Sequence, residues 1–134
     1  MFSCIFCRVV SGELPSYKLY EDDRVIAFLD IFPAVKGHIL VVPKTHAENM
    51  FASDPEDIKA TMKVVLDLAP KLEKALGADG INITINKGEA AGQSVFHTHV
   101  HILPRFKDDG KSLWGPMDSK PDLAELYEEL KQNL

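Results

Sequence analysis

The pattern of apolar and polar residues predicts five β-strands and one long helix. Short runs rich in Val, Ile and Phe are separated by turn residues, which is typical of antiparallel strands with tight connections. The predicted strands span residues 17–21, 24–29, 38–43 and 81–86, followed by a run with three histidines that ends at Arg105. These elements indicate an α+β fold with an antiparallel sheet.

Apolar residues recur at helical spacing between Ile58 and Leu76, so we expect the long helix there. Ser53 or Asp54 can cap its start, and Gly77 is placed to end it. A shorter C-terminal helix is predicted over about 120–131.

Length, charge and composition limit the classes of protein to which this chain can belong. The 134 residues are enough for one domain, which we expect to span 1–134. With 15 basic and 20 acidic residues, the net charge of −5 disfavours binding to a nucleic-acid duplex but permits a small phosphorylated ligand. No apolar stretch is long enough to cross a membrane, and the N-terminus lacks the features of a secretory signal. We therefore expect a cytoplasmic protein without a membrane partner.

His97, His99 and His101 occupy alternate positions, so a strand would direct all three imidazoles to one face. Packing does not require such a row, whereas imidazole serves both as a metal ligand and as a nucleophile. The outer two backbones would lie about 13 Å apart in a strand. That spacing counts against a metalloenzyme in which all three bind one ion, although this stays an alternative.

The loop before the histidines is rich in small and polar residues. Gly88, Gly92, Gln93 and Ser94 follow Asn86, at the end of the preceding strand. Glycines let backbone amides approach an anion, and the polar side chains add neutral donors. The loop is either a plain hairpin connection or, given the adjacent histidines, a phosphate cradle.

Cys4 and Cys7 form a C-x-x-C pair and are the only cysteines. No strand can precede them, which disfavours a thioredoxin-type redox pair. Half of a zinc site is the better interpretation, with reduced thiols as the alternative. His46 and His97 are candidates for the other two ligands, which would make a closed, structural Cys₂His₂ site.

The segments from Asp30 to His46 and from Asn86 to Arg105 together resemble the signatures of the histidine-triad (HIT) superfamily of nucleotidyl hydrolases and transferases. The second contains N-K-G-x-x-A-G-Q-S-V-x-H-x-H-x-H-x-L-P-R. The resemblance covers a core of residues 4–105 and leaves 106–134 as a C-terminal extension. It implies a HIT-like fold whose sheet continues across a homodimer.

The resemblance also implies a mechanism. His99 would attack the α-phosphorus of a nucleotide ester, anhydride or phosphoramidate, and water would then hydrolyse the nucleotidyl-histidine. His101 would contact the phosphate, and His38 would support the histidines. A purine nucleotide such as an adenosine phosphate derivative would be preferred. The choice between dinucleoside polyphosphate and phosphoramidate substrates stays open, and a non-catalytic nucleotide-binding or scaffold protein is the alternative.

The remaining roles are also carried over from the resemblance. Asp30 matches the ribose-binding residue, and Cys4, Cys7, His46 and His97 match the zinc ligands of members with an N-terminal C-x-x-C. Trp114 is a candidate to reach the partner's active site. The residues matching the phosphate region are Asn86, Gln93, Ser94 and Val95, and those matching the apolar slot for the base are Ile5, Phe6, Val9, Phe28 and Ile31.

Overall fold

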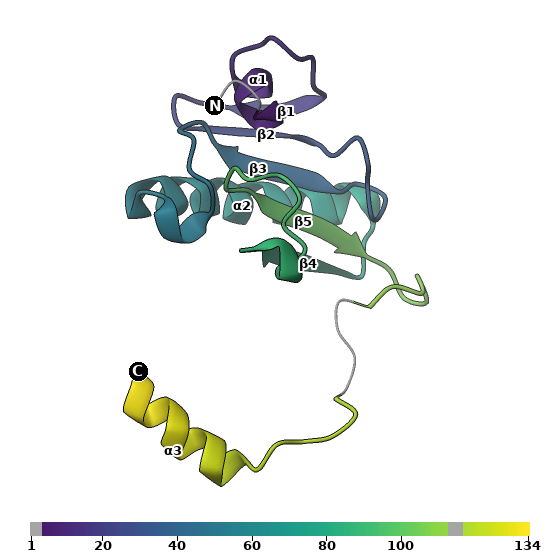
Figure 1. Cartoon of the computed structure of the whole chain (residues 1–134). Coiled ribbons are helices and arrows are strands. Elements are labelled where there is room, and N and C mark those ends of the chain that lie inside the picture. The colour runs from purple at the N-terminus through teal and green to yellow at the C-terminus, as the bar shows by residue number, and fades with distance from the viewer. Residues whose placement is uncertain (1–3, 113–116) are drawn as a thin grey trace.

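A computed structural model describes residues 4–112 and 117–134. Five antiparallel strands form one sheet in the order β1-β2-β3-β5-β4, as Figure 1 shows. The strands are β1 (Lys18–Glu21), β2 (Val25–Leu29), β3 (Ile39–Pro43), β4 (Gly80–Ile85) and β5 (Val100–Arg105). The helices are α1 (Ile5–Val10), α2 (Pro55–Leu76) and α3 (Leu123–Asn133), with short 3₁₀ turns η1 (Met50–Ala52) and η2 (Glu89–Ala91). The predicted α+β class and antiparallel sheet are confirmed.

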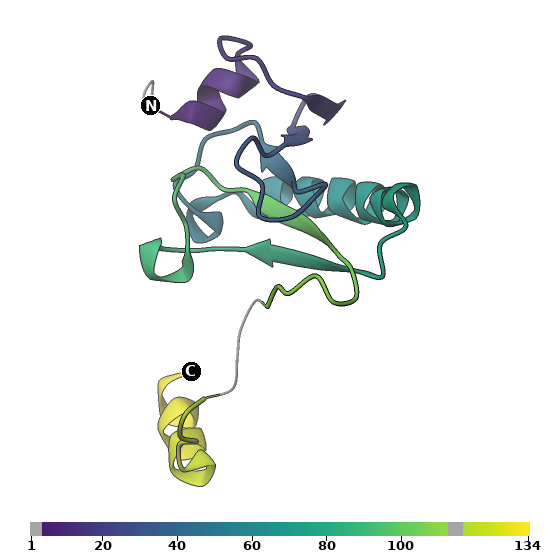
Figure 2. The same cartoon turned by 90° about the vertical axis from the view of Figure 1, so that its right-hand side faces the viewer.

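Both faces of the central strands are covered, which explains their continuous apolar runs. One face packs against α2 through a core formed by Val25, Ala27, Ile39, Val41, Val64, Val65, Ala69, Val100 and Ile102. The alternate residues of β2 and β3 point to the opposite face, where they pack against α1 in a second cluster formed by Phe6, Ile26, Phe28, Leu40 and Val42. Figure 2 shows α2 lying along the sheet, with α1 near its upper edge.

Helix α2 begins and ends where its sequence predicts. The Asp54 side chain accepts a hydrogen bond from the Glu56 N–H, and Gly77 ends the helix in a left-handed conformation. Gly37 also needs its positive φ of +84°, and an added Cβ there would overlap Leu76. The close approach places the loop of residues 30–37 against the end of α2.

The histidine run differs in part from its prediction. Regular pairing begins only at Val100, so of the three histidines only His101 lies in β5. The Thr98 N–H instead donates to the Ala47 carbonyl, 3.0 Å away. His97 and His99 therefore lie in the segment that leads into the strand, where they are held by contacts outside the sheet ladder.

Helix α3 buries none of its residues and lies apart from the sheet (Figure 1). Trp114 falls outside the described residues. None of the helices in the described part of the chain has the length and apolar character needed to cross a membrane.

Candidate functional site

The histidines gather on the face of the sheet opposite α2. His101 pairs with Leu40 of β3, and Leu40 belongs to the core cluster on that face. The ring centroids of His99 and His101 lie 4.8 Å apart, and the ring of Phe6 contacts both His97 and His99 edge-on. The three imidazoles therefore lie on one side, as their alternate spacing predicts.

A chain of hydrogen bonds fixes the tautomers of two histidines. The Ala34 backbone N–H donates to His38 Nδ1 at 3.0 Å, and His38 Nε2 lies 2.9 Å from His101 Nδ1. Since His38 Nδ1 accepts, the proton of the neutral ring is on Nε2 and is donated to His101. The proton of His101 is then on its own Nε2, a buried atom with no hydrogen-bond partner in the described structure.

His99 has the opposite tautomer to His38 and His101, with its proton on Nδ1. Its Nδ1 lies 2.7 Å from the backbone carbonyl of His97, which can only accept, so Nδ1 carries the proton. Nε2 is left with a free lone pair. The acceptor nitrogen of the His99 ring is thus paired with a buried donor nitrogen on the neighbouring His101 ring, whose centroid lies 4.8 Å away.

Burial keeps these rings neutral. Desolvation lowers the pKa of His101 to about 4, with further lowering by His99 and His38. Desolvation also lowers the pKa of His38 and the pKa of His99, each opposed in part by the Asp30 carboxylate. Neutral imidazoles fit the hydrogen-bond chain, because each ring then has one donor and one acceptor nitrogen.

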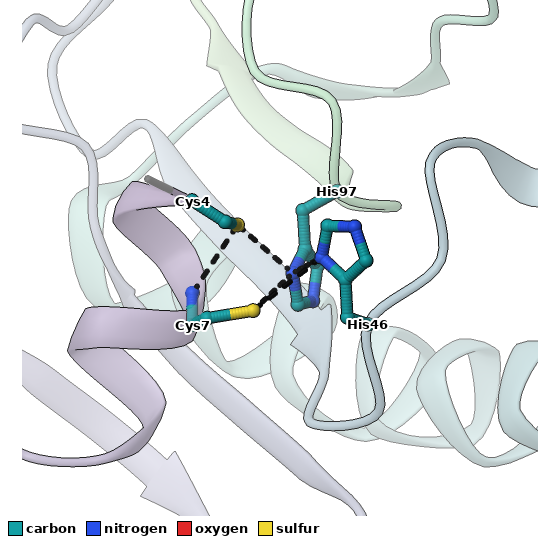
Figure 3. Close-up of side chains that lie close together, drawn as sticks. All are labelled: Cys4, Cys7, His46 and His97. Carbon is teal, nitrogen blue, oxygen red and sulfur yellow. Dashed lines mark hydrogen bonds between the residues drawn. The ribbon is translucent and has the colours of Figure 1, made fainter. Parts of the chain in front are cut away.

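Cys4, Cys7, His46 and His97 converge at a second point beside the histidines (Figure 3). Their four ligand atoms all lie within 4.8 Å of one another. His97 Nδ1 lies 3.4 Å and 3.5 Å from the Cys4 and Cys7 Sγ atoms, and 3.2 Å from His46 Nδ1. Tetrahedral zinc with ordinary bond lengths separates sulfur from nitrogen by about 3.6 Å and two nitrogens by about 3.4 Å. The spacing therefore fits zinc.

The other nitrogen of His97 supports the same interpretation. His97 Nε2 lies 2.8 Å from the Pro43 carbonyl, so Nε2 carries the proton and Nδ1 offers its lone pair to the cluster. The ring is completely buried. Because its Nδ1 belongs to this cluster while His101 bonds to His38, the three histidines do not converge on one ion in the described structure.

The loop before His97 is organised by Gln93. Its Oε1 accepts from the Gly88 N–H, and its Nε2 donates to the Glu48 and Val95 carbonyls. The side chain is almost completely buried, so its amide holds the loop together. Ser94 and Val95, in contrast, line a cavity of about 490 Å³ together with Ile5.

The predicted base-binding residues are brought together in part. Phe6, Phe28, Val9 and Val95 pack in one apolar cluster. Ile31 is 64% exposed and is not a member of this cluster. Among the other predicted residues, Asp30 Oδ2 lies 3.6 Å from His38 Nε2, and Asn86 Nδ2 lies close to Gly92.

Three backbone groups that set tautomers in this site cannot be recognised from the sequence. They are the Ala34 N–H for His38, the Pro43 carbonyl for His97 and the His97 carbonyl for His99. None of these groups belongs to a side chain. The turn-rich composition of residues 30–37 indicates a loop but cannot show where one amide will point.

Comparison with known proteins identifies the family. The HIT domain model matches residues 11–108. A zinc-bound histidine triad family protein from Mycobacterium smegmatis is 37% identical with a TM-score of 0.76, covering 99% of both chains. A histidine triad nucleotide-binding protein from Candida albicans is 32% identical with a TM-score of 0.82, covering 98% of this chain and 96% of that one. An adenylylsulfatase from Arabidopsis thaliana, HINT3, is 38% identical over 96% of this chain and 64% of its own.

The chain belongs to the HIT family, in which it is a bacterial-type member, and its cluster of Cys4, Cys7, His46 and His97 has a geometry consistent with zinc. The fold and the family agree with the predicted nucleotide-binding class.

Proposed function

We propose that this protein is a nucleotidyl hydrolase that releases a nucleoside monophosphate through a covalent intermediate on His99. The observation that carries the proposal is the pairing of two neighbouring imidazoles with opposite tautomers. His99 offers a lone pair on Nε2, whereas His101 offers a proton on Nε2. One nitrogen is suited to attack phosphorus and the other to bind a phosphoryl oxygen.

The reaction has two displacements. His99 Nε2 attacks the α-phosphorus, a phosphorus–nitrogen bond forms, and the bond to the leaving group breaks. Water then attacks the same phosphorus, the phosphorus–nitrogen bond breaks, and the nucleoside monophosphate leaves. In both steps His101 Nε2–H donates to a non-bridging oxygen, where it stabilises the charge that builds up in the transition state.

Nucleotide binding uses the surroundings of this pair. Phe6, Phe28 and Val9 would provide apolar contacts for the base. Apolar contacts discriminate weakly between bases, so we expect a preference for purines rather than strict selection. Asp30, whose Oδ2 lies 3.6 Å from His38 Nε2, would bind the ribose hydroxyls. Ser94 and the amide of Val95 would bind the phosphate, in a loop that Gln93 holds in shape.

Zinc would be held by Cys4, Cys7, His46 and His97. When bound, it compensates the thiolate charges and joins α1 to the segments around His46 and His97. All four positions are supplied by the protein, which is typical of a structural site.

The functional unit we propose is a homodimer. β4 is an edge strand whose Ile83 side chain is 41% exposed, and Leu66 on α2 is 70% exposed. Pairing of β4 with its copy would cover both side chains and satisfy the free edge, giving one continuous sheet.

The decisive experiment compares wild type with His99→Ala on adenosine 5′-phosphoramidate and diadenosine tetraphosphate, measuring AMP release and trapping the adenylylated protein by acid quench. We expect a loss of about a hundredfold or more in kcat/KM and no adduct in the variant. The ratio between the two substrates identifies the leaving group. AMP binding without turnover in wild type would support the non-catalytic alternative, and turnover that survives His99→Ala would exclude the covalent mechanism.

A further inference from the structure

His97 takes part in two different sites through two of its atoms. Its ring Nδ1 lies within 3.5 Å of both cysteine sulfurs, and its backbone carbonyl accepts the hydrogen bond from His99 Nδ1 at 2.7 Å. Only the short link between ring and backbone separates these contacts. A change in the position of the ring is therefore passed on to the atom that fixes the tautomer of His99.

The hydrogen bond to this carbonyl matters because a neutral imidazole can carry its proton on either nitrogen. If the carbonyl moves away, nothing else in the described structure holds the proton on Nδ1 of His99. Part of the population then carries it on Nε2, and that nitrogen has no lone pair with which to attack phosphorus.

Helix α1 makes a second connection between the cysteines and His99. Phe6 lies between Cys4 and Cys7 in sequence, and its ring centroid is 5.0 Å from that of His99. α1 has six residues and buries only Phe6, so it is too short to be stable alone. Phe6 packs into the apolar cluster with Phe28, and the cysteines on either side of it would add a second attachment that holds α1 in place.

The segment that carries the carbonyl lies outside the sheet ladder and is held by a few specific contacts besides the cluster: His97 Nε2 bonds to the Pro43 carbonyl, and Thr98 Oγ1 lies 2.7 Å from Ser53 Oγ. It precedes β5, and its nearest backbone anchor is the bond from the Thr98 N–H to the Ala47 carbonyl. Ala47 adjoins His46, which is also a member of the cluster. The cluster therefore joins three pieces of chain near His99: α1, the segment around His46, and the segment around His97.

We propose that Cys4, Cys7 and His46 are positioning residues for His99: the loaded cluster holds the His97 carbonyl and Phe6 so that His99 keeps its proton on Nδ1. The proposal rests on the proposed function for its kinetic consequence, but the tautomer can be measured without turnover. It assigns to the cluster an effect on reactivity beyond its contribution to stability.

His46→Gln removes one ligand with little disturbance of packing, because His46 is exposed. The experiment compares this variant and Cys7→Ser with zinc-loaded wild type. Long-range ¹H–¹⁵N spectra at about pH 8, where neutral imidazole predominates, report the tautomer of His99. Acid-quench single turnovers with adenosine 5′-phosphoramidate report the rate of adenylylation.

In both variants we expect a mixture of His99 tautomers, and a fall of about ten- to a hundredfold in the adenylylation rate. Far-UV circular dichroism should show the sheet and α2 intact, since their core lies on the other face. The matched control is Val65→Ala, which weakens that core without touching the cluster. It should lower the melting temperature while leaving the tautomer and the rate unchanged.

A single Nδ1–H tautomer and an unchanged rate in folded His46→Gln would overturn the proposal, as would an equal loss in Val65→Ala at matched stability. If Cys7→Ser fails to fold, His46→Gln decides. Absence of an adduct in wild type would reject the proposed function instead, and the tautomer comparison would still test the positioning role.

Discussion

Replacing His38 with Glu or Gln tests whether its hydrogen bond sets the chemistry of His101. Gln can accept from the Ala34 N–H through its oxygen and donate to His101 Nδ1 through its nitrogen, as His38 does. An ionised Glu can only accept. It would draw the His101 proton to Nδ1 and leave a lone pair on Nε2.

The size of the effect follows from the bond that is lost. A hydrogen bond to a charged group contributes about 1.5–3 kcal/mol, which corresponds to about a 10- to 150-fold loss in kcat/KM. We therefore expect a loss in this range for His38→Glu and a loss of about fivefold or less for His38→Gln. The difference should be larger in kcat than in KM, because charge on the phosphoryl oxygens grows in the transition state.

The assay is steady-state AMP release from adenosine 5′-phosphoramidate at about pH 8, where a partly buried Glu is more fully ionised. Melting temperature and AMP affinity show whether each variant retains its fold and its nucleotide site. Equal losses in the two variants would refute the reasoning, because donor and acceptor character would then have no influence at this position.

Three other predictions concern stability and assembly. Burial lowers the pKa of His101 to about 4, so below about pH 6.5 the unfolded chain binds more protons than the folded protein. The free energy of unfolding should therefore fall by about 2 kcal/mol from pH 7 to pH 5. In His101→Gln the free energy of unfolding should depend less on pH. Urea unfolding measures this, and identical slopes in both proteins would contradict it. Gly37→Ala should cost about 2–4 kcal/mol, since its methyl overlaps Leu76 at positive φ, whereas Gly77→Ala, with free space around it, should cost about 1 kcal/mol. Equal decreases in melting temperature for Gly37→Ala and Gly77→Ala would contradict the proposed overlap with Leu76. Ile83→Glu should convert a dimer to monomer by light scattering, and a monomeric wild type would rule out the proposed interface.

Much of the architecture could be predicted because its signals are local. Period-two patterns located the strands, and the positions of Asp54 and Gly77 fixed the ends of α2. The strand predicted through all three histidines was only partly right. Thr98 bonds to Ala47 rather than to a neighbouring strand, and the pattern of side chains cannot show where a backbone leaves the ladder.

The site was predictable at the level of residue types and grouping. The cysteines, His46 and His97 do converge, and His38 does contact His101. The tautomers could not be predicted, because they depend on three backbone groups, at Ala34, Pro43 and His97. Their orientation is a property of the folded chain that no side chain encodes.

The C-x-x-C pair has a consequence for how the molecule is made. Cys4 is synthesised well before its partner His97, which lies 93 residues later in the chain. The complete ligand set therefore cannot form until most of the sheet has been synthesised, and metal loading belongs to the end of folding. A cross-link stabilises a fold more when it closes a longer loop of the unfolded chain. A disulfide across about 100 residues, for comparison, raises the free energy of unfolding by about 4–5 kcal/mol in principle. If the cluster binds zinc as proposed, newly made protein without zinc would lack the link between α1 and the segment around His97, and zinc supply would influence how much fully cross-linked protein forms.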